Sequence, residues 1–389
     1  TVDNHVGDIG AAIQAVVEPA GFTIVRDLVG QHVVHGPREG APEPAELVHA
    51  FEERLPGVQV LGERAALAGF TRNGPWSCGG SFRALPAADG WLGISLARPS
   101  DLELVPALTA DEDDRDPWAV VARWSATVTA AEAAERAALL GMAACAVPPD
   151  HTVTRPGVVV TEGASRAVAE RPRILDLTSL WAGPLCAHLL GLGGAEVTKV
   201  ESTRRPDGAR RGVPEFFELL HHGHDTVVVD FDSSVGRAQL RALIEQSDLV
   251  LEASRPRALQ QLGIRAEEHV AAGVSWLSIS ARGRGHNRVG FGDDVAVGAG
   301  LYVVEDGEVL PCGDALADPL AGVASAAAAA EALLLPHACL IDVSMHDVAR
   351  ETLLPEVEPH RTEQRAGEWW VETATGLHLV APPRGRRHP

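Results

Sequence analysis

Short apolar runs alternate with stretches of helical spacing through the middle of the chain. The runs that indicate strands include Ile174–Leu177, Thr226–Phe231, Leu249–Glu252 and Val274–Ser280. Helical spacing lies between them, for example over Val235–Gln246. Strands that alternate with helices in this way are typical of βαβ units. The pattern therefore predicts an α/β fold with a doubly wound, mostly parallel, Rossmann-like sheet.

A second, smaller α+β domain is predicted before this core. Its centre, Asn73–Pro99, has the pattern of two hairpin strands around Ala88-Asp89-Gly90. A stretch rich in Pro, Gly, Ser and Thr follows and is typical of a linker. We expect five parts: an extra segment (1–40), the small α+β domain (41–146), the linker (147–172), the Rossmann-like core (173–347), and a C-terminal hairpin and tail (348–389).

The start of the core carries the most specific pattern. A strand runs into the turn Ala182-Gly183-Pro184, a helix follows over Leu185–Leu192, and a second strand ends at Val200. Such a turn aims backbone N–H groups at a ligand above it. The arginines that follow can hold phosphate oxygens; they are Arg204, Arg205, Arg210 and Arg211. The alternative is an ordinary βαβ unit with a solvated basic loop. No G-x-G-x-x-G stands between strand and helix, which argues against a nicotinamide cofactor.

Composition narrows the classes of partner. The 389 residues carry a net charge of −20, which argues against nucleic acid or an anionic membrane surface. The Ala-rich run Ala321–Leu335 is short and holds Ser325 and Glu331, so we expect a buried helix rather than a membrane span. The five cysteines are scattered without a C-x-x-C pattern, and no leader pattern opens the chain. These features predict a cytoplasmic protein.

Several ordered blocks resemble CoA-transferase family III, which includes formyl-CoA:oxalate and carnitine CoA-transferases and acyl-CoA racemases. The family's LDLT-x-x-x-AGP and GA-x-V-x-KVE signatures are matched by Leu175–Pro184 and Gly194–Glu201. Further similar blocks are Val228–Arg237, Ser247–Gly263, Leu316–Gly322 and Leu340–Ser344. The resemblance implies an enzyme that moves CoA from an acyl-CoA to a carboxylic acid acceptor. Family members form interlocked dimers, so it also implies a homodimer.

The resemblance makes Asp318 the candidate catalytic residue. In the family an aspartate of the matching segment attacks the acyl-CoA thioester and passes through an acyl–aspartyl anhydride and an aspartyl-CoA thioester. Asp318 also stands at the start of an Ala-rich helix, where a carboxylate is stabilised. From the local sequence alone, a simple N-cap followed by Pro319 is the alternative. Asp314 is the second candidate.

The resemblance also implies a CoA site, with CoA as substrate and no metal. Its expected residues are Trp181, Ala182, Arg204, Arg205, His224 and Arg255. The family often has Arg or Lys directly after KVE, where this chain has Ser202, so the phosphate contact moves to Arg204 or Arg205. The histidines around His224 could instead bind a metal or lie on an inactive surface loop.

Two further aspartates, Asp293 and Asp294, fall in the segment that implies a substrate pocket. The racemases have a histidine at the position of Asp293, and two-base racemisation needs a group that titrates near neutrality. Its absence favours transfer over a 2-methylacyl-CoA racemase or epimerase. A non-catalytic CoA-binding partner subunit is the third possibility.

The order of the blocks departs from the family. The strand pair around Ala88-Asp89-Gly90 precedes the core here and follows it in the family, so the blocks are permuted. Residues 6–30 weakly resemble a methionine aminopeptidase fragment. That fragment continues with a metal-binding Gly-His-Gly, whereas this chain has Gly30-Gln31-His32. We expect a fusion remnant or chance similarity without metal activity.

Overall fold

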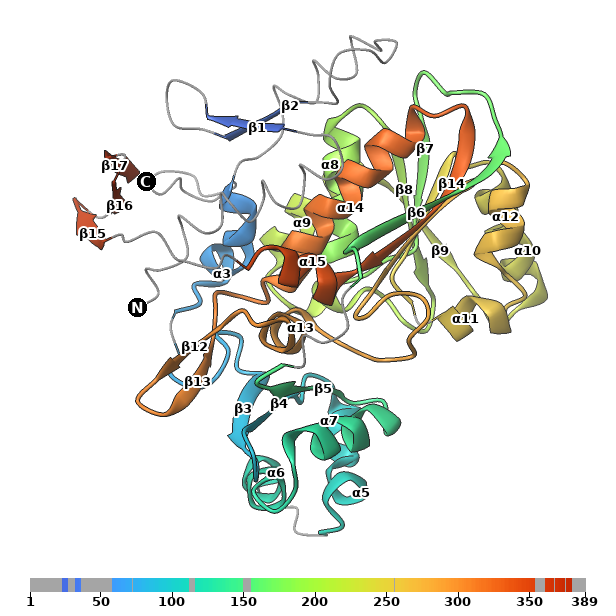
Figure 1. Ribbon diagram of the computed structural model, residues 1–389. Coiled ribbons are helices and arrows are strands. Elements are labelled where there is room, and N and C mark those ends of the chain that lie inside the picture. Colours follow the sequence, from blue (N-terminus) through green and yellow to red (C-terminus); the bar gives the residue numbers. More distant parts are fainter. Residues whose placement is uncertain are drawn as a thin grey trace.

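The structure of the protein is a computed structural model (Figure 1). It describes residues 23–26, 32–35, 58–71, 73–111, 116–149, 155–254, 256–353, 361–366, 368–374 and 376–379. In these residues a large sheet with helices on both faces stands beside a smaller unit, as Figure 1 shows. No helix among the described residues is long and apolar enough to cross a membrane.

The large sheet has seven strands in the order β6-β14-β11-β10-β7-β8-β9. Every neighbouring pair is parallel except β14 with the edge strand β6. The strands are β6 (Val158–Ser165), β7 (Arg173–Asp176), β8 (Glu196–Ser202), β9 (Asp225–Val229), β10 (Leu249–Glu252), β11 (Ser275–Ser280) and β14 (His337–Ser344). The predicted doubly wound, mostly parallel Rossmann-like sheet is confirmed.

Helices cover both faces because alternate strand residues point to opposite sides. In β10, Leu249 and Leu251 pack with the helices of one face, and Val250 packs with those of the other. The first face holds α8 (Ala182–Leu192), α9 (Pro214–His221), α13 (Gly292–Ala299), α14 (Ala317–Leu333) and α15 (Met345–Glu351). The second holds α10 (Ser234–Glu245), α11 (Pro256–Gln261) and α12 (Ala266–Ala271).

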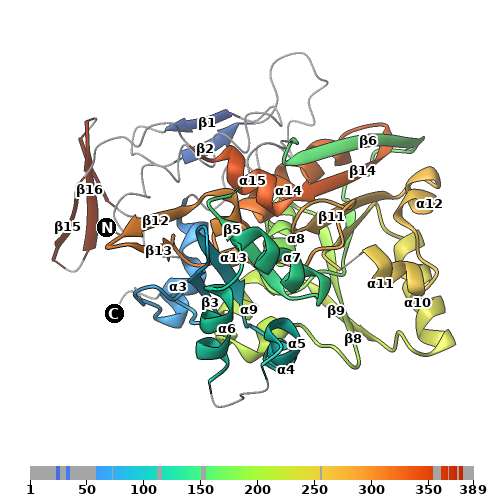
Figure 2. The ribbon, with the colours of Figure 1, turned by 60° about the horizontal axis from the view of Figure 1, so that its bottom comes forward.

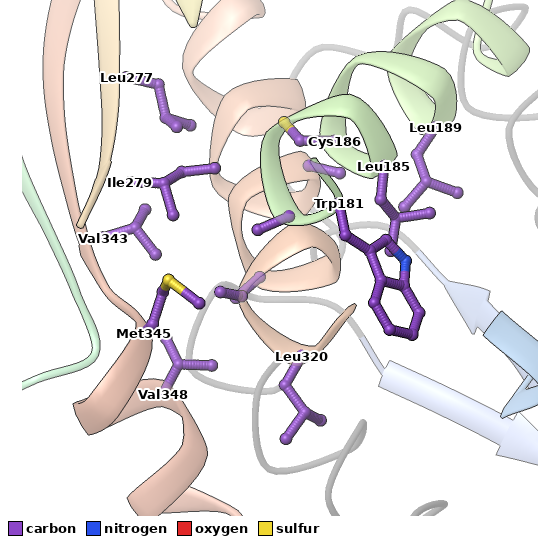
Figure 3. Packing of buried hydrophobic residues seen from close by; sticks show 14 of the residues in the cluster. Trp181, Leu185, Cys186, Leu189, Leu277, Ile279, Leu320, Val343, Met345 and Val348 are labelled. Atoms are coloured by element: carbon purple, nitrogen blue, oxygen red, sulfur yellow. The ribbon is translucent and has the colours of Figure 1, made fainter. Parts of the chain in front are cut away.

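Two central helices, α8 and α14, pack closely on the sheet. Figure 3 shows Leu185 and Trp181 of the α8 segment beside Leu320 of α14, with Ile279 and Val343 of the sheet nearby. Gly322 allows this approach, because a Cβ there would stand 2.7 Å from the carbonyl oxygen of Ala182. The Ala-rich run of α14 is thus a buried helix, as predicted.

The smaller unit is α+β, as predicted. An antiparallel sheet of β3 (Phe82–Pro86), β4 (Trp91–Ser95) and β5 (Ala143–Val147) packs on α4 (Pro99–Glu103), α5 (Val105–Thr109), α6 (Pro117–Ser125) and α7 (Ala130–Leu139). The β3–β4 hairpin turns at Ala88-Asp89-Gly90. Figure 2 shows α13 of the core next to this sheet, where Val297 packs on Phe82 and Cys145.

The predicted linker contains a strand. Within 147–172 the chain forms β6, which pairs antiparallel with β14. The pattern did not reveal it because this edge strand is exposed over most of its length and therefore lacks a buried, alternating face. The core consequently extends from β6 to α15.

Short elements complete the described chain. The predicted C-terminal hairpin is β16 (Glu368–Thr373) with β17 (Gly376–Leu379), and β15 (Arg361–Arg365) adds a third strand. The others are β1 (Thr23–Arg26), β2 (His32–His35), η2 (Val58–Leu61), α3 (Glu63–Ala68), η3 (Gly208–Arg211), β12 (Tyr302–Glu305) and β13 (Glu308–Pro311). Most of residues 6–30 lies outside the described residues.

Candidate active site

Asp318 lies in the first turn of α14, one residue after the helix begins. Its own N–H binds the carbonyl oxygen of Ala315 at 2.9 Å. The residue is half-buried between the core helices. A carboxylate at this end of a helix is favoured by the unpaired N–H groups and the helix dipole.

The turn that begins α8 reaches the same carboxylate. The backbone N–H of Ala182 lies beside the Asp318 carboxylate and acts to lower its pKa. The contact depends on the close approach of α14 to α8 at Gly322. On the other side, a Cβ at Gly292 would stand 2.4 Å from Oδ2 of Asp318. Backbone from two glycine-containing segments therefore encloses the carboxylate.

A buried group of charges surrounds Asp318. Arg64 of α3 donates from Nε to Asp314 at 2.8 Å and makes a second bond from Nη2 to the other oxygen. Asp293 of α13 is buried and accepts the N–H of Ala315 at 2.9 Å. Three carboxylates and one guanidinium thus meet at the start of α14.

The environment changes how Asp318 titrates. Burial, together with the charges of Asp293 and Asp314, raises the pKa of Asp318 to about 7 against the opposing charge of Arg64. Burial and the nearby charge of Asp314 also raise the pKa of Asp293. A carboxyl with a pKa near neutrality in a cluster of charges marks a candidate functional site.

Asp294 connects the core to the smaller unit. Its carboxylate accepts the hydroxyl of Ser95 of β4 at 2.9 Å and the N–H of Phe291 at 2.9 Å. Burial raises the pKa of Asp294 to about 7. The second bond caps the start of α13. Substrate contacts for Asp293 and Asp294 stay a prediction.

A buried lysine network fixes the turn before α8. Lys199 of β8 lies 3.0 Å from Asp207 and 3.4 Å from Asp176, and it also binds the carbonyl oxygen of Thr178. Burial alone would lower the pKa of Lys199, but the two carboxylates raise it. Asp207 in turn accepts the N–H of Leu180, which has φ of 73°. These bonds hold the turn that presents Ala182.

The predicted arginines follow β8 at the carboxyl edge of the parallel strands, as the turn of Trp181 follows β7. Arg204 is largely exposed and pairs with Asp232 at 2.9 Å. Arg205 is exposed, so both side chains can turn toward a ligand. Arg210 is engaged differently, because it pairs with Glu201 at 2.7 Å and lies over the ring of Phe217.

The other predicted CoA residues have distinct environments. Trp181 is buried against Phe216 and beneath the guanidinium of Arg64. His224 packs toward Gly191 of α8, where burial lowers its pKa. Arg255 lies outside the described residues. Among the described residues, no group of three His, Cys, Asp or Glu side chains is arranged to hold a metal.

Sequence reasoning missed two contributors to this site. Arg64 reaches Asp314 across 250 positions, and nothing in its local sequence marks it. Lys199 was visible as the lysine of the KVE signature, but a lysine in a strand gives no sign of which carboxylates it meets. Only the packing of β7, β8 and the loop after β8 brings Asp176 and Asp207 to it.

Comparison of the sequence with known proteins identifies a family and several relatives. The family model described as CoA-transferase family III matches residues 170–379, which is more than half of the chain. A succinyl-CoA–D-citramalate CoA-transferase of Chloroflexus aurantiacus is 26% identical over 232 residues, which cover 54% of this chain and 56% of that protein. A formyl-CoA:oxalate CoA-transferase of Afipia carboxidovorans is 34% identical over 102 residues, 24% of each chain.

A solved structure of a CaiB/BaiF family protein from Brucella suis is 22% identical, with a TM-score of 0.47 and coverage of 54% of this chain and 66% of that one. The chain spans about half the length, or less, of these two curated relatives. The match of the family model and the predicted signature blocks fall on the same Rossmann-like core, from the strand before the Ala182 turn through α14. The chain belongs to CoA-transferase family III.

Proposed function

We propose that this protein transfers CoA from an acyl-CoA to a carboxylic acid, with Asp318 as the residue that carries the acyl group. The observation that supports this most directly is the Ala182 N–H beside the Asp318 carboxylate at the start of α14. An N–H in that position can stabilise the oxyanion that forms on the aspartyl carbonyl when the CoA thiolate attacks the anhydride.

The chemistry divides into balanced exchanges at one carboxylate. Asp318 attacks the thioester carbonyl, the carbon–sulfur bond breaks, and CoA leaves as the thiolate with an acyl–aspartyl anhydride on the enzyme. The thiolate then attacks the aspartyl carbonyl, which forms an aspartyl-CoA thioester and releases the donor acid. The acceptor carboxylate repeats these steps in reverse, so that its CoA ester leaves and Asp318 is regenerated.

We propose that CoA lies along the carboxyl edge of the parallel strands, where open α/β sheets bind ligands. Trp181 and Ala182 belong to the turn after β7, and Arg204 and Arg205 follow β8. The exposed guanidinium groups suit the phosphates of CoA. His224 and Arg255 stay candidate contacts of the same ligand.

Racemisation of a 2-methylacyl-CoA is the alternative that the charge cluster supports. Asp318 has a pKa near 7, and Asp293 also has a raised pKa. Two acid/base groups with raised pKa values could exchange an α-proton. However, Asp293 is buried, and one of its oxygens already accepts the N–H of Ala315. Transfer therefore remains the first proposal.

The resemblance to the family also suggests an oligomeric state for the protein. We propose a homodimer, which light scattering of the purified chain would test. All five cysteines lie in the described residues and none forms a disulfide, which suits a reducing compartment such as the cytoplasm.

The decisive experiment is the search for the covalent intermediate. The wild type is mixed with a panel of acyl-CoAs, quenched, and analysed by mass spectrometry with fragmentation to locate the adduct. We expect an acyl or CoA adduct on Asp318 that hydroxylamine releases, and none in Asp318→Asn, since an amide of equal size cannot attack a thioester. Asp314→Asn should still form the adduct.

Two results would overturn the proposal. Exchange of the α-proton with solvent deuterium, without any adduct, would favour racemisation over CoA transfer as the function of the protein. Binding of CoA by calorimetry, with neither adduct nor exchange, would indicate the non-catalytic partner subunit.

A further inference from the structure

Arg64 is far in sequence from the segment that carries Asp314 and Asp318, yet its side chain binds Asp314. It lies on α3, before the smaller unit, and its guanidinium binds both oxygens of Asp314. The same group lies 4.9 Å above the ring of Trp181. Asp314 is almost fully buried, whereas 30% of the Arg64 side chain is exposed. The arginine therefore closes the acidic cluster from the solvent side.

The charge of Arg64 acts on each carboxylate of the cluster. Burial alone would lower the pKa of Arg64, but the bond to Asp314 and the charges of Asp314, Asp318 and Asp293 raise it above its ordinary range. Asp314 takes the Nε and Nη2 donors, which form one edge of the Arg64 guanidinium. The positive charge of the same group acts on the reaction through the carboxylates around it.

We propose that Arg64 is a positioning residue for the transfer reaction, which neutralises Asp314 and stacks on Trp181 so that Asp318 is ionised when the thioester arrives. This inference rests on the proposed role of Asp318. Without Arg64, Asp314 becomes an unpaired negative charge beside Asp318, and like charges disfavour ionisation. The nucleophile would then be protonated over a wider pH range.

Other groups near Asp318 come from several elements. Asp293 and Asp314 act on it directly, and α8 supplies the Ala182 N–H. Cys78 lies close to Asp314, and burial raises the pKa of its thiol to about 12, so it stays neutral. On α15, which also packs on α14, His346 and Asp347 bind each other. None of these supplies the fixed positive charge that Arg64 brings to Asp314.

The test uses three variants and one matched control. Arg64→Met removes the charge, Arg64→Lys keeps it, and Arg64→Met with Asp314→Asn removes both partners of the pair. Arg98→Met is the control, because Arg98 is also half-buried, binds a buried aspartate and lies over an aromatic ring, that of Phe291. The readout is the rate of adduct formation on Asp318 in a single turnover, between about pH 5 and about pH 9.

We expect the acid limb of the wild-type profile to move to higher pH by about one unit in Arg64→Met. The double variant should return toward the wild-type limb, because the unpaired charge is gone. Arg64→Lys should keep the limb near its wild-type position at a lower maximal rate, and Arg98→Met should leave the limb unchanged. An unmoved limb in a folded Arg64→Met, or a limb that stays displaced in the double variant, would overturn the proposal.

A second readout does not depend on the reaction. Asp318 has a folded-state pKa near 7 and an ordinary value of 3.8, so the folded state binds more protons between these values. The contribution of Asp318 to stability against urea is therefore complete below about pH 4 and is lost as the pH rises through 7. Arg64→Met should extend this loss to higher pH, and adding Asp318→Asn should abolish the extension. If the wild type forms no adduct, the proposed function fails while this measurement still decides the role of Arg64.

Discussion

The carboxylate of Asp318 combines two properties that oppose each other. Burial raises its pKa to about 7, whereas Arg64 and the Ala182 N–H favour the ionised form that a nucleophile needs. The result is a group that is partly ionised at neutral pH. Single residues on other elements therefore control what fraction of Asp318 is ionised. Arg204 and Arg205, which we propose as phosphate contacts, are exposed and need only turn toward a ligand.

Replacing Arg204 and Arg205 together by alanine should weaken CoA binding by about 1–3 kcal/mol, because charge-assisted bonds to phosphate are lost. Calorimetry with CoA and with dephospho-CoA measures the loss. Arg171→Ala is the matched control, since Arg171 is equally exposed, pairs with Glu196, and lies at the opposite edge of the sheet. Equal CoA affinities for the wild type and the double variant would show that the two arginines only belong to a solvated loop and do not bind CoA.

The pairing of α8 and α14 decides whether the site exists. The sequence places Ala182 and Asp318 at the starts of two helices, and Gly322 lets those helices approach closely enough for the N–H to reach the carboxylate. The ion pairs of Lys199 with Asp176 and Asp207 fix the turn that carries Ala182. Asp318 and Gly322 therefore act on the same contact, because residues four apart in a helix lie one turn apart on the same face.

Gly322→Ala should separate these helices, since the new methyl group would stand 2.7 Å from the carbonyl oxygen of Ala182. We expect a loss of about 1–3 kcal/mol in the free energy of unfolding, as for other overpacked cores. Adduct formation on Asp318 should slow by more than this loss of stability explains. Gly285→Ala is the control, because a Cβ there meets no atom within 4 Å. A variant as stable and as reactive as the control would contradict this account.

At the scale of the whole molecule, the smaller unit is joined to the core beside the acidic cluster. Ser95 of β4 binds Asp294, and Cys78 contacts the carbonyl oxygen of Gly313, which directly precedes Asp314. Phe82 and Cys145 pack with Val297 at the same boundary. The smaller unit, which precedes the core in the sequence, therefore lies against the segment that bears Asp318.

Ser95→Ala should weaken this boundary in a pH-dependent way. The Ser95 hydroxyl favours the ionised form of Asp294, whose pKa is about 7. Above that value the variant leaves a buried carboxylate with one donor fewer, which costs about 1–3 kcal/mol. Below about pH 6 the carboxyl is protonated and the cost should shrink. Urea unfolding above about pH 7 and below about pH 6 measures this difference, with the exposed Ser100→Ala as control. An equal loss of unfolding free energy in both pH ranges would refute the prediction.

Much of the fold could be predicted from local pattern. Apolar runs that alternate with helical spacing specify a parallel sheet with two covered faces, because only buried strands such as Leu249–Glu252 are apolar on both sides. The strand β6 was missed, since an exposed edge strand has no such pattern. In the site, the turn at Ala182 and the helix start at Asp318 were predicted, because each depends on a few consecutive residues.

The sequence by itself determined the elements, the turn and the identity of the carboxylate that we propose as nucleophile. Tertiary structure alone decided which charges surround that carboxylate. Arg64 meets Asp314 across 250 positions, and Lys199 meets Asp207 only because a loop folds back over β8. Electrostatic interactions depend on distance in space and on burial, and neither is written in the spacing of residues along the chain.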